Sequence, residues 1–446
     1  MQKKTNDVIV VGVALFAMFF GAGNLIFPPY MGLLAGTAWP LAMIGFLITG
    51  IGMPLLGIMA AARAGGSVEH LGSRVNPWFG RVLGIVVILA IGPLLAIPRT
   101  AAVAFEMGIR PSFEGFSPAL FSIIFFGITL AMAMKRSAVV DRIGKFLTPF
   151  LAVTLAWIII KGILTPVGSI VETGLAAPFG RGFQEGYQTM DAMASIVFAE
   201  IVIAALIFKG YRGVKDQVKM TSLAGVIAAA GLGLVYGGLM YLGATAGSEF
   251  TQDVERTELL ISIAQHLLGA GGKVALGLAV GLACLTTSIG LTATVADYFN
   301  ELSKDRVSYG AICVATVVFS GVFATVGVET IVAVAFPLLF LAYPVVITLI
   351  LLTMLGGPAR HTAIYAGGVV GALTTSIFDA FNAAGLPITS ANELLANVPG
   401  AGGGFGWILP ALIGIVIGLV LARKGYGNPI PKVTAEELAE ATTELE

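Results

Sequence analysis

Long apolar runs separated by short polar segments dominate this chain of 446 residues. A helix needs about 20 apolar residues to cross roughly 30 Å of hydrocarbon. Twelve segments approach or exceed that length, and they lie near residues 8–36, 39–62, 80–106, 117–134, 146–166, 188–208, 220–245, 273–298, 307–327, 330–355, 362–383 and 405–422. The pattern predicts an all-α polytopic membrane protein with about 12 transmembrane helices.

The first apolar run is interrupted by five residues that weaken or break helices. These are Gly21, Gly23, Asn24, Pro28 and Pro29, within the stretch FFGAGNLIFPPY. One interpretation is a proline kink, which needs only one proline. The other is a helix that stops and restarts, which hydrocarbon tolerates only where the freed backbone groups are buried in protein or face water. The cluster favours an interruption whose carbonyls face a cation and whose amides face a carboxylate.

The eighth apolar run carries three adjacent hydroxyl groups, on Thr286, Thr287 and Ser288. A single buried threonine usually satisfies its hydroxyl on the carbonyl four residues earlier. Several hydroxyls side by side could instead complete an oxygen shell for a small, hard cation. Both interpretations remain open at this point.

The charge pattern predicts how the chain is oriented. With the N-terminus inside, most of the 25 Lys and Arg residues fall in the inner loops, as the positive-inside rule requires. We therefore expect both termini in the cytoplasm. An outer segment at 252–269 has the apolar spacing of an amphipathic helix, and the acidic end of the chain, 425–446, predicts a cytoplasmic tail.

Composition excludes several classes of protein. The chain is 57% hydrophobic and 11% charged, with a mean hydropathy of +0.94, which is typical of membrane proteins. Its net charge is zero and it has no basic cluster, so we expect no nucleic-acid partner. Two cysteines and three dispersed histidines offer neither a metal cluster nor the groups of an enzyme active site. No nucleotide-binding motif or channel-filter repeat is present.

Two stretches resemble the signatures of a known family, the bacterial branched-chain amino acid:cation symporters. They are GVALFAMFFGAGNLIFPPYMG and GFQEGYQTMDAMASIVFAEIV, and the similarity extends through all twelve runs. The resemblance implies the leucine-transporter fold of the amino acid-polyamine-organocation superfamily, with discontinuous first and sixth helices. It places a 5+5 inverted repeat at 8–166 and 188–355, and two extra helices at 362–422.

The same resemblance implies a set of binding residues. A sodium ion would be held by the carbonyls of Ala17, Phe20 and Ala283 and the hydroxyls of Thr286 and Thr287. Residues implied to bind the substrate are Gly21, Ala22, Gly23, Asn24, Asp191, Ala194, Ser195 and Phe198. Among these, the first three would donate to the substrate carboxylate. Unwound backbone near Ala192 to Ser195 would take the ammonium group, and Phe198 would line an apolar pocket. Asn24 also matches a ligand of a second sodium in some relatives.

Five ionisable residues lie in or near the apolar runs: Arg99, Glu106, Asp191, Glu200 and Asp379. Buried charges are costly in a membrane, so each should face water, a partner or a ligand. Asp191 could neutralise a cation or an ammonium group, or it could simply cap a helix. Arg99 is expected near the outer end of its helix, as a gate or a snorkelling side chain. For Glu200 and Asp379 we expect structural pairing.

These observations predict a transporter and not an enzyme. The family resemblance implies that the activity is uptake of leucine, isoleucine and valine across the cell membrane, coupled to sodium by alternating access. Proton coupling, or another neutral amino acid, is the alternative. We expect no cofactor apart from the coupling ion, Na+ or H+, and a monomer surrounded by membrane lipid.

Overall fold

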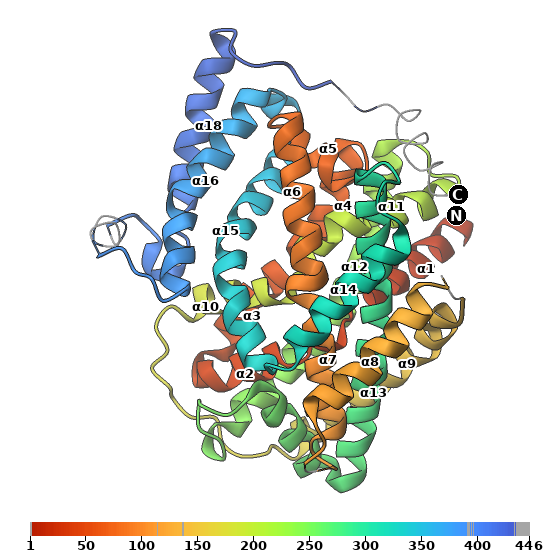
Figure 1. Cartoon of the computed structure of the whole chain (residues 1–446). Coiled ribbons are helices and arrows are strands. Elements are labelled where there is room, and N and C mark those ends of the chain that lie inside the picture. The colour runs from red at the N-terminus through yellow and green to blue at the C-terminus, as the bar shows by residue number, and fades with distance from the viewer. Residues whose placement is uncertain are drawn as a thin grey trace.

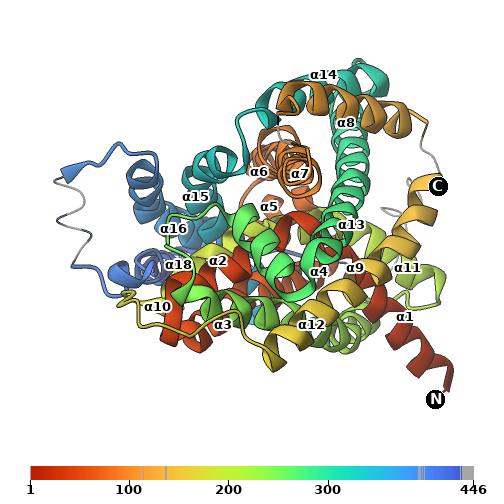
Figure 2. The ribbon, with the colours of Figure 1, turned by 90° about the horizontal axis from the view of Figure 1, so that it is seen from below.

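The apolar runs form helices that pack into one bundle (Figure 1). The computed structural model describes residues 2–113, 115–135, 138–389, 393, 395, 397–431 and 433, and at 2, 3, 22, 138–147 and 358 it describes the backbone alone. The predicted tail is therefore outside the described residues from 434 onward. Viewed from below, α16 and α18 lie together at one side and α8 and α14 at another (Figure 2).

The helices of the first half are α1 (Gln2–Phe19), η1 (Ala22–Asn24), α2 (Phe27–Ala35), η2 (Gly36–Ala38), α3 (Trp39–Leu47), η3 (Ile48–Gly52), α4 (Met53–Ala64), α5 (Val68–Ser73), α6 (Pro77–Leu89), η4 (Ala90–Leu94), α7 (Ala96–Ala104), η5 (Phe105–Ile109), α8 (Pro118–Ala133) and α9 (Ala138–Leu164). Those of the second half are α10 (Pro178–Glu185), η6 (Gly186–Thr189), α11 (Asp191–Phe208), α12 (Val214–Thr245), η7 (Ala246–Ser248), α13 (Arg256–Leu302), α14 (Tyr309–Ala324), α15 (Val328–Leu355), η8 (Gly357–Ala359), α16 (Thr362–Ala383), η9 (Ala401–Gly403) and α18 (Ile408–Arg423).

Several of these helices suit a membrane. Within the described residues, seven helical segments are long and apolar enough to cross one, and four apolar helices are shorter. Large apolar side chains also point away from the bundle, among them Ile123, Val153, Leu234 and Val322, each more than two-thirds exposed. Hydrocarbon is the solvent in which such faces are stable. The number of twelve spans stays a prediction.

The interruption of the first helix is confirmed, and it is more than a kink. Helix α1 ends at Phe19, a short 3₁₀ turn spans Ala22–Asn24, and α2 starts at Phe27. Pro28 and Pro29 stand in the first turn of α2, where a missing N–H leaves no hydrogen bond unmade. The prolines thus fix where the second half-helix begins.

The sixth helix is also interrupted, but not where the sequence analysis placed the break. The gap is η6 with Met190, whose φ of 59° is left-handed, and it separates α10 from α11. The prediction of unwound backbone at Ala192 to Ser195 is wrong, because α11 is helical from Asp191 onward. The first half-helix, α10, begins at Pro178, before the predicted start of the second repeat at 188, and the division into repeats stays a prediction.

A third interruption, in the third apolar run, has no counterpart in the sequence analysis. Between α6 and α7, Gly92 has non-helical φ and ψ of −98° and −125°, and Pro93 lacks an N–H. The five-residue η4 segment is wound more loosely than an α-helix. This break redirects α7, and α7 carries Arg99.

The predicted amphipathic helix is present as the first part of α13. It starts at Arg256 and ends at a kink at Gly269, where φ is +68°. Its apolar face is buried through Leu259, Leu260 and Ile263. The helix therefore packs on the protein.

Glycines allow some helices to approach each other at backbone distance. A Cβ at Gly32 of α2 would lie 1.9 Å from the carbonyl oxygen of Met240 in α12, and one at Gly243 would lie 1.8 Å from that of Pro29. Helices α16 and α18 meet in the same way at Gly367 and Gly414. Close contact of small residues is the usual way for membrane helices to associate. It fixes α2, which carries one side of the first interruption, against α12.

This packing predicts that Gly243→Ala destabilises the protein. The added methyl group meets the Pro29 backbone, which cannot move without shifting α2, and overpacking of this kind costs about 1–3 kcal/mol. The thermal midpoint of the detergent-purified protein should fall. Gly233→Ala in the same helix is the control, because no atom lies within 4 Å of its Cβ position. Equal midpoints for the two variants would contradict the prediction.

Candidate functional site

The first and sixth helices are joined at their interruptions by a buried hydrogen-bonded pair. The side-chain amide of Asn24, in η1, donates to both carboxylate oxygens of Asp191, at 3.1 and 3.0 Å. Asn24 is 4% exposed and Asp191 7% exposed. Asp191 is the first residue of α11, and its backbone N–H donates to the Thr189 hydroxyl. The structure therefore brings two of the predicted substrate residues into contact.

Arg99 reaches the same place from α7. One guanidinium nitrogen donates to the carbonyl oxygen of Gln188 at 2.6 Å, and another donates to the side-chain oxygen of Asn24 at 3.3 Å. The guanidinium carbon lies 5.0 Å from the centre of the Phe27 ring, within range of a cation–π contact. Arg99 is only 4% exposed. The expectation of a snorkelling side chain is therefore wrong, and a role as a gate stays a prediction.

Side chains of other helices also donate to two carbonyl groups of the broken helices. The Tyr236 hydroxyl of α12 donates to the Phe19 carbonyl at the end of α1, at 3.3 Å. The Thr49 hydroxyl, in η3, donates at 2.8 Å to the Phe183 carbonyl near the end of α10. Because unpaired backbone groups are costly away from water, these contacts make both interruptions stable inside the bundle.

Two glycines of the first interruption border the guanidinium and the Asn24 amide. A Cβ added at Gly23 would meet only Arg99, at 3.6 and 3.9 Å, and one at Gly21 would meet only Asn24, at 3.5 and 3.8 Å. By contrast, glycines at helix contacts leave no room for a Cβ. Both glycines are half-buried. Their predicted role as donors to a carboxylate, and that of Ala22, stays a prediction.

The other predicted substrate residues divide into two groups. Ala194 and Phe198 follow Asp191 at helical spacing on one face of α11, and both are half-buried. Ser195 is fully buried instead against Gly57 of α4, and its hydroxyl donates to the Ala192 carbonyl at 2.8 Å. The structure therefore leaves Ser195 outside the group around Arg99.

The predicted cation ligands on α13 show the hydrogen bonds of the simpler interpretation, in which threonine hydroxyls donate to a carbonyl one turn earlier. The hydroxyls of Thr286 and Thr287 both donate to the Ala283 carbonyl, at 3.0 and 2.9 Å. Both threonines are half-buried, and α13 contacts η1 and α2. Ala17 lies exposed on α1, and Phe20 is buried just after it. Coordination of an ion by this group, including the carbonyls of Ala17 and Phe20, stays a prediction.

A second group of charges closes the bundle at the start of α13. Arg256 forms ion pairs with Glu185 of α10, at 3.4 Å, and with Glu329 of α15. Its guanidinium also lies 4.0 Å from the centre of the Tyr30 ring in α2. The Arg256 and Glu185 side chains are 9% and 3% exposed. One arginine thus contacts three other helices, α2, α10 and α15, from the start of α13.

Glu106, Glu200 and Asp379 differ in whether they make hydrogen bonds. Glu106 accepts hydrogen bonds from the Thr257 hydroxyl at 2.7 Å and from the Val328 N–H at 2.9 Å. Within the described part of the chain, Glu200 and Asp379 make no hydrogen bond or ion pair, so the expected structural pairing is not present there.

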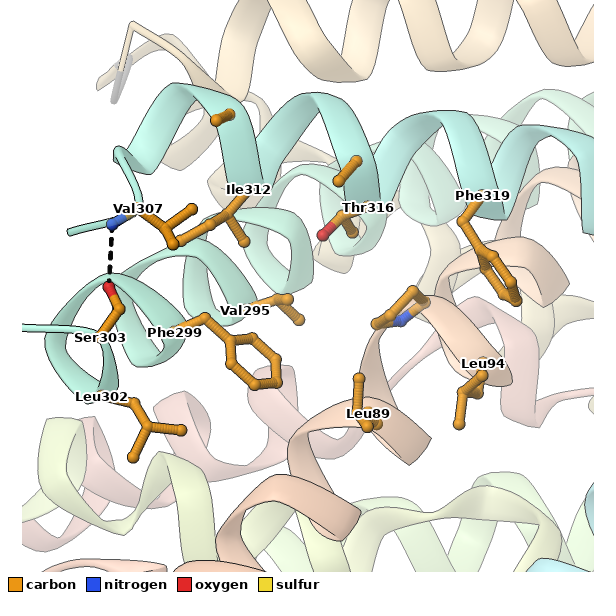
Figure 3. Close-up of a pocket in the computed structure, with 13 residues that line it drawn as sticks. Leu89, Leu94, Val295, Phe299, Leu302, Ser303, Val307, Ile312, Thr316 and Phe319 are labelled. Carbon is orange, nitrogen blue, oxygen red and sulfur yellow. Dashed lines mark hydrogen bonds between the residues drawn. The ribbon is translucent and has the colours of Figure 1, made fainter. Parts of the chain in front are cut away.

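A large cavity lies elsewhere, between η4, the end of α13 and α14 (Figure 3). Its volume is about 690 Å³, and residues such as Leu94, Phe299 and Phe319 line it. None of the lining side chains is charged. A ligand with charged groups would lose its hydration there without replacement. The interruptions are therefore the better candidate site.

The sequence analysis missed the central position of Arg99 and the contribution of Gln188. One signal was present: Gly92-Pro93 stands just before Arg99 and resembles the breaks elsewhere in the chain. For the sixth helix, Pro178, Gly180, Gly182 and Gly186 precede the predicted span. The half-helix α10 has only 8 residues, which is too short for a hydropathy pattern to identify as part of a span.

Comparison with known sequences gives a consistent result. A family model described as "Branched-chain amino acid transport protein" matches residues 4–425. The branched-chain amino acid permease BraB of Bacillus subtilis is 41% identical over 426 residues, which cover 93% of this chain and 95% of the relative. The permease BrnQ of the same bacterium is 37% identical over 434 residues, which cover 95% of this chain and 98% of the relative. A branched-chain amino acid transport system 2 carrier protein of Pseudomonas aeruginosa is 35% identical over 426 residues, which cover 94% of this chain and 97% of the relative.

Solved structures confirm the fold. Mhp1, a nucleobase-cation-symport-1 family transporter in a closed conformation with bromovinylhydantoin bound, superposes with a TM-score of 0.63. It is 12% identical, and the match covers 98% of this chain and 96% of that one. MhsT in complex with L-phenylalanine has a TM-score of 0.55 at 17% sequence identity, and the match covers 92% of this chain and 98% of MhsT. At such identity the likeness concerns the fold alone, which is the all-α leucine-transporter fold.

The Arg256 cluster predicts a large difference between two arginine substitutions. Arg256→Met leaves the buried Glu185 carboxylate unpaired, and breaking a buried ion pair costs about 3–5 kcal/mol. Arg110→Met removes the Arg110–Glu255 pair, whose side chains are 57% and 42% exposed, and should cost about 0–1 kcal/mol. The thermal midpoint in detergent measures both. The prediction fails if Arg256→Met is as stable as Arg110→Met.

Proposed function

We propose that this chain, which belongs to the family of branched-chain amino acid transport proteins, carries leucine, isoleucine and valine into the cell together with sodium. The observation that supports this most directly is the meeting of two interrupted helices around Asn24, Arg99 and Asp191. Interrupted helices near the middle of a membrane protein provide free backbone groups for a polar substrate and its ion. The relatives' names supply the substrate class.

The ion assignment rests on the α13 cluster. A carbonyl and two hydroxyl oxygens, on Ala283, Thr286 and Thr287, are ligands of the kind that hard cations prefer. The hydroxyls lie within 3.0 Å of that carbonyl, and the helix that carries them contacts the first interruption. We infer that a sodium ion binds there and that the carbonyls of Ala17 and Phe20 complete its shell.

The proposed mechanism is alternating access. The Arg256 cluster joins α2, α10, α13 and α15 at one end of the bundle, while Lys209 and Asp7 form an ion pair of 2.9 Å that joins the end of α11 to α1. With both termini in the cytoplasm, the first contact closes the outside and the second lies inside. Sodium and substrate would favour rearrangement of the interrupted helices, so that one closure opens as the other forms. We propose that a monomer in membrane lipid performs this cycle.

The first test is transport by the purified protein in proteoliposomes. An inward sodium gradient should make radiolabelled leucine accumulate above its external concentration, because downhill ion entry supplies the free energy. Isoleucine and valine should compete with leucine. Vesicles with equal sodium on both sides and vesicles with an imposed proton gradient are the controls. Accumulation driven by protons alone would reject sodium coupling, and no accumulation under either gradient would reject symport.

The second test concerns the ion ligands. Thr286→Ala combined with Thr287→Ala removes two oxygen atoms, so the sodium concentration for half-maximal leucine uptake should rise about tenfold or more, given that 1.4 kcal/mol is a factor of ten. Thr294→Ala in the same helix is the matched control, since its hydroxyl donates to the Gly290 carbonyl in the same manner. An unchanged sodium dependence in the double variant would remove these residues from the ion site.

A further inference from the structure

Two opposite charges lie on either side of Asn24, on different helices. Asn24 uses its amide group to donate to Asp191 and its oxygen to accept from Arg99. One side chain of the first interruption therefore holds an anion from the sixth helix and a cation from the third in fixed positions. The three residues are at least nine-tenths buried.

The charges balance each other within the site. Burying a single charge here would cost much free energy, whereas burying an arginine and a carboxylate that share a hydrogen-bonded amide costs less. An α-amino acid at neutral pH also carries one positive and one negative charge. It can thus enter beside the pair without adding net charge, with each end next to a group of opposite sign.

Both charged groups retain capacity for a ligand. A guanidinium has five N–H donors, and the hydrogen bonds to Gln188 and Asn24 use two of them. Each carboxylate oxygen of Asp191 can accept more than the one hydrogen bond it receives from Asn24. The side-chain oxygen of Gln188 is buried with no hydrogen-bond partner among the described residues, so it can accept from an ammonium group.

The surroundings of the pair have the matching polarity. A Cβ position at Gly23 lies 3.6 Å from Arg99, and one at Gly21 lies 3.5 Å from Asn24. One face of α11 continues from Asp191 to the apolar residues Ala194 and Phe198. Groups that suit the polar head of an amino acid are therefore followed along α11 by residues that suit its apolar side chain.

We propose that Arg99 binds the carboxylate of the amino-acid substrate and that Asp191 binds its ammonium group. This inference rests on the proposed function, and it differs from the sequence-based expectation by assigning the carboxylate to an arginine side chain on the third helix. Arg99 and Asp191 are then the residues that require the ligand to be a zwitterion.

The test compares leucine with two analogues, each of which lacks one of its two charged groups. Leucine has both charged groups, leucinamide lacks the carboxylate, and 4-methylpentanoate lacks the ammonium group. Ligand-induced thermal stabilisation of the purified full-length protein, titrated with each ligand, gives the three affinities. The wild-type protein should prefer leucine over both analogues. Absence of that preference would overturn the inference.

Each of two variants should lose discrimination against one of the two analogues and keep it against the other. Arg99→Gln should reduce the preference for leucine over leucinamide about 10- to 100-fold, the size of one charge-assisted hydrogen bond, and should retain discrimination against 4-methylpentanoate. Asp191→Asn should show the reverse pattern. Arg110→Gln, next to the same helical run but exposed, should leave both preferences unchanged.

A purely structural role of Arg99 gives a different result. If Arg99 only linked the two interruptions, Arg99→Gln would weaken leucine and leucinamide equally, and that outcome would overturn the inference. Should Arg99→Gln fail to fold, Arg99→Lys keeps the positive charge and must still prefer leucine over leucinamide; loss of the preference there also rejects it. Leucine binding with unaltered discrimination in the variants contradicts this inference alone, whereas a wild-type protein that no branched-chain amino acid stabilises contradicts the proposed function as well.

Discussion

Every backbone group freed by an interrupted helix must find a partner inside a bundle that hydrocarbon surrounds, and the site is organised by that constraint. Arg99 pairs with the Gln188 carbonyl, Tyr236 with the Phe19 carbonyl and Thr49 with the Phe183 carbonyl. These partners come from α7, α12 and η3, so side chains from three other parts of the bundle support the two interruptions. The same side chains that stabilise the breaks place donors and acceptors where a polar ligand can reach them.

The cost of burying charge explains why two buried arginines, Arg99 and Arg256, each lie close to carboxylates. Asn24 forms hydrogen bonds with both Arg99 and Asp191. Arg256 forms ion pairs with Glu185 and Glu329. Each arginine also lies over an aromatic ring, that of Phe27 or Tyr30, both of which belong to α2. Helix α2 therefore contacts both charge clusters, and its backbone is fixed against α12 by glycine contacts. A movement of α2 would alter the two clusters together.

Local sequence chemistry predicted some breaks and missed others for an identifiable reason. In the first helix, two glycines and two prolines surround a polar residue inside a long apolar run, so the interruption could be predicted directly. The sixth helix is different, because the chain from Asp191 to Phe208 contains no Gly or Pro and its missing half is only 8 residues long. Its interruption became visible through family resemblance, and its position only through the packing of α10 on α3. The contacts of Arg99 with both interruptions were not predicted, and neither was the break at Gly92 that precedes it.

The amino-acid sequence by itself determined the all-helical membrane character of the protein, the interruption at Gly21 to Asn24 and the amphipathic helix before Gly269. Hydrophobic length, glycine and proline chemistry and helical spacing are local properties, so the residues alone disclose them. Only the tertiary structure decided that Arg99, Asn24 and Asp191 meet, and that Ser195 packs against Gly57 instead. These residues belong to helices far apart in the chain, and their contacts depend on backbone approaches that no local pattern records.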